Sequence, residues 1–201
     1  MTTMADVLTP LSWRRGEAAR WVLDATLVLA GSLLVALSAQ VAIVLPFTPV
    51  PITGQTFAVL LVAAALGGRR GALAMVAYLA EGAAGLPVFS AGACCAPWLL
   101  GPTAGFLWSY PLVAFAVGAL AERGWDRSPI RAGVAMLAGN ALIYLVALPW
   151  LAFFVGAGRV LETGLLPFIP GDLLKVVLAA VALPSGWALI GAARRSTGID
   201  D

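Results

Sequence analysis

An acid and a base stand three residues apart near the end of the chain, where a long apolar segment begins. Asp172 and Lys175 follow the run Pro167-Phe-Ile-Pro-Gly and precede Val-Val-Leu-Ala-Ala-Val-Ala-Leu. In a helix these two side chains lie on one face, one turn apart. Because a lone charge in hydrocarbon is costly, charges at such depth are usually paired and functional. As a binding site, Asp172 would accept N–H donors from a ligand, and Lys175 would bind a carboxylate or donate to a carbonyl oxygen.

The same pair has a plainer interpretation as the start of a helix. An acid in the first turn complements the positive end of the helix dipole, and Pro170 suits that position. Three other polar residues lie inside apolar segments and carry similar alternatives. Glu81 is either an interfacial glutamate or part of a site. Asn140 and Tyr144, spaced i,i+4, could hydrogen-bond a ligand or join two helices.

The composition is that of an integral membrane protein. Of the 201 residues, 61% are hydrophobic and 11% are charged, and the mean hydropathy is +0.97. Histidine is absent, which removes the commonest metal ligand and general base. Motifs for nucleotide hydrolysis, serine or zinc hydrolysis and redox chemistry are also missing. We therefore expect no enzymatic activity, no cofactor, no metal and no nucleic acid partner.

Six apolar stretches are separated by polar or Pro/Gly-rich connectors, and they predict an all-α membrane protein in one domain, residues 1–201. The second and third stretches are short, which suggests tilted helices or a hairpin. No cleavable signal peptide is apparent before Trp21. The expected spans are 21–45, 53–66, 71–85, 102–121, 132–155 and 171–193.

The arginines predict the orientation of these spans. Ten of the twelve basic residues lie before the first span, after the last, or in the connectors 67–70 and 122–131. By the positive-inside rule both termini are cytoplasmic, so loops 46–53, 86–101 and 156–170 face outward, together with Asp172 and Lys175. The prolines of the first outer loop would stiffen it, either as a lid with Phe47, Val50 and Ile52 as its apolar lining or as a plain turn between helices. Loop 87–101 would form a second lid, in which Trp98 lines a pocket or anchors at the interface. That placement suits capture of an external solute.

Five stretches stand in order along the chain: Pro49-Val-Pro-Ile-Thr-Gly-Gln-Thr56, Gly71-Ala-Leu, Tyr78-Leu-Ala-Glu-Gly-Ala-Ala-Gly-Leu-Pro-Val-Phe89, Leu100-Gly-Pro-Thr-Ala-Gly-Phe106 and Pro167-Phe-Ile-Pro-Gly-Asp-Leu-Leu-Lys175. Together they resemble the BioY family, the biotin-specific S-components of energy-coupling-factor (ECF) vitamin transporters. The resemblance covers about residues 25–190. The chain departs from the family around Ser90-Ala-Gly-Ala-Cys-Cys-Ala-Pro-Trp98, where family members commonly have a glycine-rich stretch and the cysteines are unusual.

The resemblance implies a six-helix protein of the cytoplasmic membrane that binds biotin near its outer face with high affinity. It would work with a transmembrane coupling subunit and two cytoplasmic ATPases. The Gly-Asp-Leu-x-Lys motif gives Asp172 and Lys175 a ligand-binding role, without assigning either to one end of biotin. The candidate substrate-binding residues are Asp172, Lys175, Tyr78, Glu81, Phe89, Ser90, Thr103, Asn140 and Tyr144.

Two alternative functions remain open from the sequence. One is an S-component for another small vitamin, or a carrier that works without ATPases. The other is a structural membrane protein in which the charge pair only caps a helix, and this alternative predicts no ligand.

Overall fold

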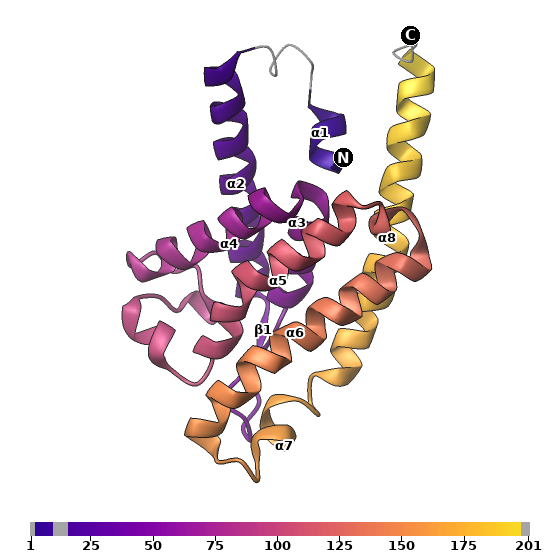
Figure 1. Cartoon of the computed structure of the whole chain (residues 1–201). Helices are drawn as coiled ribbons and strands as arrows, with labels where there is room; N and C mark the ends of the chain where they lie inside the picture. Colours follow the sequence, from indigo (N-terminus) through magenta and orange to yellow (C-terminus); the bar gives the residue numbers. More distant parts are fainter. Residues whose placement is uncertain (1–2, 10–15, 198–201) are drawn as a thin grey trace.

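The computed structural model of the chain describes residues 3–9 and 16–197, and these residues are mostly helical (Figure 1). The α-helices are α1 (Met4–Leu8), α2 (Glu17–Gln40), α3 (Gln55–Leu66), α4 (Gly68–Ala83), α5 (Ala104–Glu122), α6 (Pro129–Val155), α7 (Val160–Gly164) and α8 (Ile169–Thr197). Short 3-10 turns are η2 (Ser90–Gly92), η3 (Ala96–Leu100) and η4 (Trp125–Arg127).

Four of the described helices are long and apolar enough to cross a membrane alone: α2, α5, α6 and α8. The helices α3 and α4 have 12 and 16 residues. At about 1.5 Å per residue they fall short of a hydrocarbon core of about 30 Å. Each of the six predicted spans overlaps one of these six helices, with boundaries that differ by a few residues.

The end of the first predicted span is wrong. We expected it to run to residue 45, but α2 ends at Gln40. The strand β1 (Ala42–Ile43) then pairs antiparallel with β2 (Ile52–Thr53), so that Ala42 faces Thr53. The β-branched residues Ile43, Ile52 and Thr53 favour this extended pairing over helix. The stiff loop between them is thus held at both ends.

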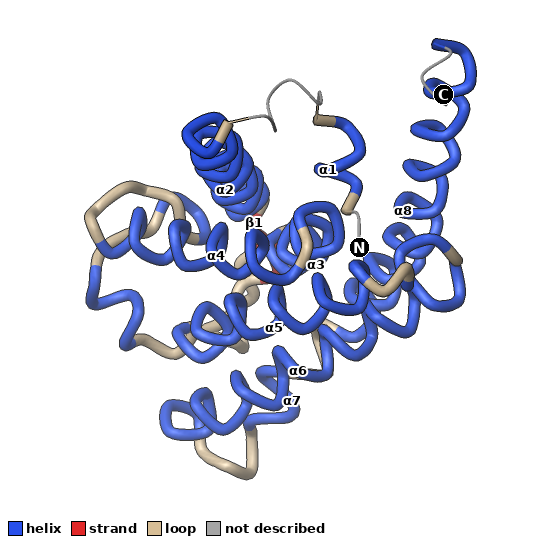
Figure 2. Tube along the Cα trace, turned by 45° about the horizontal axis from the view of Figure 1, so that its top comes forward, coloured by secondary structure: helices blue, strands red, loops and turns tan. Residues whose placement is uncertain are grey.

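The short helix α3 is central, whereas the long helices α2 and α8 are peripheral. Figure 2 shows α3 between α2, α4, α5 and α8, and it packs against all four. In contrast, α2 and α8 expose leucines and valines along much of their length, such as Leu33, Leu37, Val177 and Val181. An apolar surface of this extent is stable against lipid chains but not against water.

The start of α2 and the end of α8 lie at one end of the molecule, and α7 lies at the other (Figure 1). At the first end Arg70 of α4 forms ion pairs with Asp6 and with Asp24, both at 2.7 Å. Two of the arginines used to predict orientation, Arg14 and Arg15, lie outside the described residues.

At the same end, side-chain contacts join the α5–α6 connector to α8. The indole of Trp187 donates a hydrogen bond of 2.5 Å to the buried Asp126, and the Arg127 guanidinium stacks over that indole. Burial raises the pKa of the Asp126 carboxyl, and the hydrogen bond from Trp187 offsets part of that effect.

Candidate functional site

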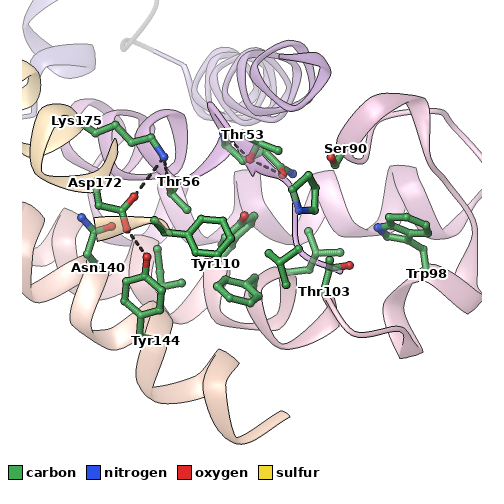
Figure 3. A pocket seen from close by; sticks show the side chains of 17 residues that line it. Thr53, Thr56, Ser90, Trp98, Thr103, Tyr110, Asn140, Tyr144, Asp172 and Lys175 are labelled. Atoms are coloured by element: carbon green, nitrogen blue, oxygen red, sulfur yellow. Dashed lines mark hydrogen bonds and ion pairs between the residues drawn. The ribbon is translucent and has the colours of Figure 1, made fainter. Parts of the chain in front are cut away.

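One pocket gathers residues from every segment that was expected to face outward (Figure 3). It has about 590 Å³ not filled by protein atoms, part of it open to solvent. Its lining comes from the β1–β2 loop and β2, the first turn of α3, loop 86–101, α5 with the residue before it, α6, the end of loop 156–170 and the start of α8. The lining residues are Val50, Pro51, Thr53, Gln55, Thr56, Ser90, Trp98, Thr103, Phe106, Leu107, Tyr110, Asn140, Ile143, Tyr144, Phe168, Asp172 and Lys175.

The charged end of the pocket is built around Asp172. Its Oδ1 lies 3.2 Å from Lys175 Nζ, and its Oδ2 accepts a hydrogen bond from the Tyr144 hydroxyl. Lys175 Nζ also donates to Thr56 Oγ1 at 2.8 Å. The pair therefore joins α8 to α3 and α6, which a simple helix cap would not require. Both charges are partly shielded from water, with side-chain exposures of 11% for Asp172 and 16% for Lys175.

Local sequence explains why these two side chains point into the pocket. The α8 helix begins at Ile169 with Pro170 in its first turn. The backbone N–H of Asp172 donates a hydrogen bond of 2.9 Å to Phe168 O. Proline is well tolerated there because the first N–H groups of a helix lack intrahelical partners. From this start, the i,i+3 spacing sets Asp172 and Lys175 on one face.

Two buried polar groups in the pocket wall have no hydrogen-bond partner among the described residues. They are Asn140 Nδ2 and Ser90 Oγ, in residues that are 6% and 7% exposed. The hydroxyl of Tyr110, also in the lining, makes no hydrogen bond to any described residue either. Leaving a buried donor or acceptor unpaired costs about 1–3 kcal/mol, so such groups usually have a role. All three are placed to bond a polar ligand.

The space between these polar groups is walled by aromatic and aliphatic side chains. Phe106 lies edge-on to Tyr144, with ring centroids 6.2 Å apart. The centroid of its ring is 6.4 Å from that of Phe168. Leu107 and Ile143 complete this wall and are buried. The pocket thus suits a compact molecule with an apolar body and polar groups at its ends.

Six of the nine candidate residues line the pocket: Asp172, Lys175, Ser90, Thr103, Asn140 and Tyr144. The other three lie outside the lining. The Tyr78 hydroxyl accepts a hydrogen bond of 2.5 Å from Gln55 Nε2 and donates to Val88 O at 3.1 Å. Phe89 packs edge-on against Tyr78, with centroids 5.5 Å apart. Glu81 accepts a hydrogen bond from Ser32 on α2. Tyr78 and Phe89 therefore lie outside the pocket lining and hold Gln55 and loop 86–101 in place.

Sequence reasoning passed over several lining residues. Gln55 and Thr56 end the first matching stretch, and their polarity at the start of an apolar helix was an available signal. Phe168 stands in the motif that contains Asp172. Tyr110 and Ile143 gave no signal, because an apolar or aromatic residue in a membrane helix faces lipid as readily as a pocket. Among the described residues, no group of histidine, cysteine or acidic side chains is arranged to hold a metal.

A family model described as the BioY family matches residues 8–192 of this chain. The chain belongs to the BioY family. The resemblance inferred from the sequence is thereby confirmed. BioY proteins are transporter subunits, not enzymes, and several apolar helices make this member a membrane protein.

Curated relatives and a solved structure agree with this assignment. The chain is 37% identical over 172 residues to a biotin transporter BioY of Rhizobium etli, covering 80% of this chain and 92% of that protein. It is 40% identical over 164 residues to a biotin transporter BioY of Rhodobacter capsulatus, covering 75% and 85%. A crystal structure of the S-component for biotin from an ECF-type ABC transporter superimposes with a TM-score of 0.74 at 26% identity, covering 83% of this chain and 91% of that one.

Proposed function

We propose that this chain captures biotin and takes it up across the cell membrane as the substrate-binding subunit of an ECF transporter. The observation that supports this most directly is the pocket itself. It combines an acid–base pair with buried, unpartnered polar groups and an apolar centre, in a chain whose relatives are named as biotin transporters. The chemistry is binding alone, and the site residues bond or enclose the ligand.

The two ends of biotin match the two ends of the pocket. Biotin has an ureido ring with two N–H donors and a carbonyl, an apolar thiophane ring and a valerate carboxylate. At the buried end, Asp172 would accept an ureido N–H while Lys175 and Asn140 Nδ2 donate to the carbonyl. The carboxylate would then lie toward Thr103 and Trp98, where Trp98 is 37% exposed and the charge stays hydrated. Lys175 could instead bind the carboxylate, which gives the opposite orientation.

The membrane arrangement proposed here is a single domain of six helices, α2 to α6 and α8, with both termini in the cytoplasm. The arginine distribution supports the orientation. The start of α2 and the end of α8 at one end of the molecule agree with an even number of crossings. The chain would work in the cytoplasmic membrane with a transmembrane coupling subunit and two ATPases, because it has no nucleotide-hydrolysis motif of its own.

The ligand can be identified directly from purified protein. Small-molecule mass spectrometry of the material released on denaturation is expected to detect biotin. Competition should then show displacement of labelled biotin by unlabelled biotin but not by thiamine or riboflavin. Displacement by thiamine or riboflavin would favour a different vitamin, and absence of any bound or binding vitamin would favour a structural role. Purification from native membranes without ATPase subunits would favour a carrier that acts alone.

The orientation of biotin predicts how a neutral carboxyl group affects binding. In the proposed orientation, biotin amide should bind within about tenfold of biotin, because its altered end lies at the hydrated rim. In the opposite orientation the amide loses an ion pair with Lys175, and its affinity should fall by about a hundredfold or more. Titration calorimetry of biotin and biotin amide, with a biotin analogue altered at the ureido ring as the matched control, distinguishes the two.

A further inference from the structure

The adjacent cysteines Cys94 and Cys95 form a disulfide in the loop that supplies two pocket-lining residues. Ser90 stands four residues before Cys94, and Trp98 stands three residues after Cys95. Both cysteines are partly exposed, so small reagents can reach them. Adjacent cysteines close a very small ring, which removes most of the conformational freedom of the two residues and of the peptide bond between them.

Cys95 is one of the points at which this loop is attached to the rest of the protein, and it is the one next to the turn that contains Trp98. Its backbone N–H donates to Gly82 O at the end of α4 at 2.7 Å. Its carbonyl accepts the N–H of Trp98 at 3.0 Å, which starts the turn that carries the indole to the pocket rim. The φ angle of Cys95 is +79°, in a region that residues with a Cβ seldom adopt. Such a conformation persists only where its surroundings hold it.

We propose that the Cys94–Cys95 disulfide is a redox-controlled positioning element that holds Trp98 over the mouth of the pocket. Without the bond, Cys95 is free to return to a negative φ. That rotation turns its N–H and its carbonyl away from Gly82 and Trp98. Trp98 is then no longer held at the pocket rim, and the dissociation rate of the ligand increases. This inference rests on the proposed function, because its measure is the release of biotin.

The redox step needs an external dithiol as its reductant. A dithiol thiolate attacks one sulfur, the Cys94–Cys95 bond breaks, and the second dithiol sulfur resolves the mixed disulfide. Two electrons and two protons pass to the cysteines, and the dithiol becomes a disulfide. In the orientation proposed above, the loop faces the exterior, where disulfides form and persist.

Reversible reduction of the full-length protein in lipid nanodiscs tests the proposal without depending on the folding of a variant. Protein is kept oxidised or treated with dithiothreitol, and thiol alkylation with intact mass verifies the state of the two cysteines. Dissociation of radiolabelled biotin is then followed after a chase. We expect release to be about tenfold faster from the reduced protein, and reoxidation to restore the slow rate.

Two variants separate this role from general stabilisation. The C94S/C95S double variant should release biotin at the fast rate with or without dithiothreitol. Trp98→Ala should also release biotin fast and should no longer respond to reduction. Equal release rates from verified oxidised and reduced protein would overturn the inference, as would a full response in Trp98→Ala. Failure of both forms to bind biotin would instead overturn the proposed function, and this inference with it.

Discussion

Asp172→Asn is expected to weaken biotin binding by at least about a hundredfold. In the folded protein both carboxylate oxygens are engaged, one by Lys175 and one by Tyr144. Asparagine keeps the shape but removes the charge and replaces one acceptor with a donor. The Lys175 ammonium is then left in a shielded pocket without a counter-ion. Removing one partner of a buried, hydrogen-bonded charge pair costs about 2–5 kcal/mol, and about 1.4 kcal/mol corresponds to tenfold in affinity.

Lys175→Ala should cause a loss of similar size, and the double variant should lose less than the sum of the two. Each single change leaves one uncompensated charge, whereas the double change leaves none. Isothermal titration of biotin onto the three variants measures this coupling. Glu162→Gln provides the matched control, because Glu162 is an exposed acid of α7 outside the pocket lining, and it should bind like wild type. Wild-type affinity in both Asp172→Asn and Lys175→Ala would contradict a role for the pair.

The charge pair was predictable because its signal is local. An acid and a base at i,i+3 spacing are rare in an apolar segment, and their cost in hydrocarbon makes them conspicuous. The arginine pattern is equally local, since each connector can be read by itself. For the same reason each predicted apolar stretch overlaps a helix, α2 to α6 or α8, although the ends of those helices differ from the predicted bounds. The end of α2 depends on pairing of Ala42 with Thr53, across a loop whose geometry the sequence pattern does not specify.

The remainder of the pocket depends on packing between distant segments. Gln55 reaches the lining because Tyr78, 23 residues later, binds its amide, and Tyr78 is in turn fixed by Val88 O and Phe89. Thr56 takes part because Lys175, 119 positions away, reaches it. No spacing rule links such residues. The sequence therefore suggested Tyr78 as a ligand contact, whereas in the structure its hydroxyl is hydrogen-bonded to Gln55 and to Val88 O. Buried networks of this kind become visible only once the helices are placed.

Gly118→Ala is expected to lower stability by about 3 kcal/mol or more, through the contact that places α3 and α4 on α5. A Cβ at position 118 would lie 2.4 Å from both Gly67 C and Gly68 N, which are backbone atoms of the α3–α4 turn. Side chains can rotate away from such a clash, but this turn is held, because Glu122 Oε1 accepts the Gly68 N–H at 2.9 Å. Overpacking typically costs about 1–3 kcal/mol, and backbone contacts lie at the upper end. For a chain of this size the melting temperature should fall by roughly 10 °C.

Gly133→Ala in α6 is the matched control for that change. Like Gly118, it lies in a helix that is long and apolar enough to cross a membrane, but the nearest atom to its added Cβ, in Ala180, would lie 3.7 Å away, an ordinary contact. Because alanine is the better helix former, Gly133→Ala should melt at or above the wild-type temperature. Thermal unfolding of the three proteins in one detergent, followed by intrinsic fluorescence, gives the comparison. Equal melting of Gly118→Ala and Gly133→Ala would show that the α3–α4 turn moves aside without cost.

The same substitution should reach the pocket, because α3 connects the turn to the ligand site. Its last turn adjoins Gly67, while its first turn carries Gln55 and Thr56 into the lining. A helix of 12 residues moves largely as a unit, so displacement at one end shifts Thr56 away from Lys175 at the other. Gly118→Ala that has been purified in folded form should therefore bind biotin more weakly, and Gly133→Ala should bind normally. Unchanged affinity in a destabilised Gly118→Ala would mean that α3 is fixed by the pocket residues themselves.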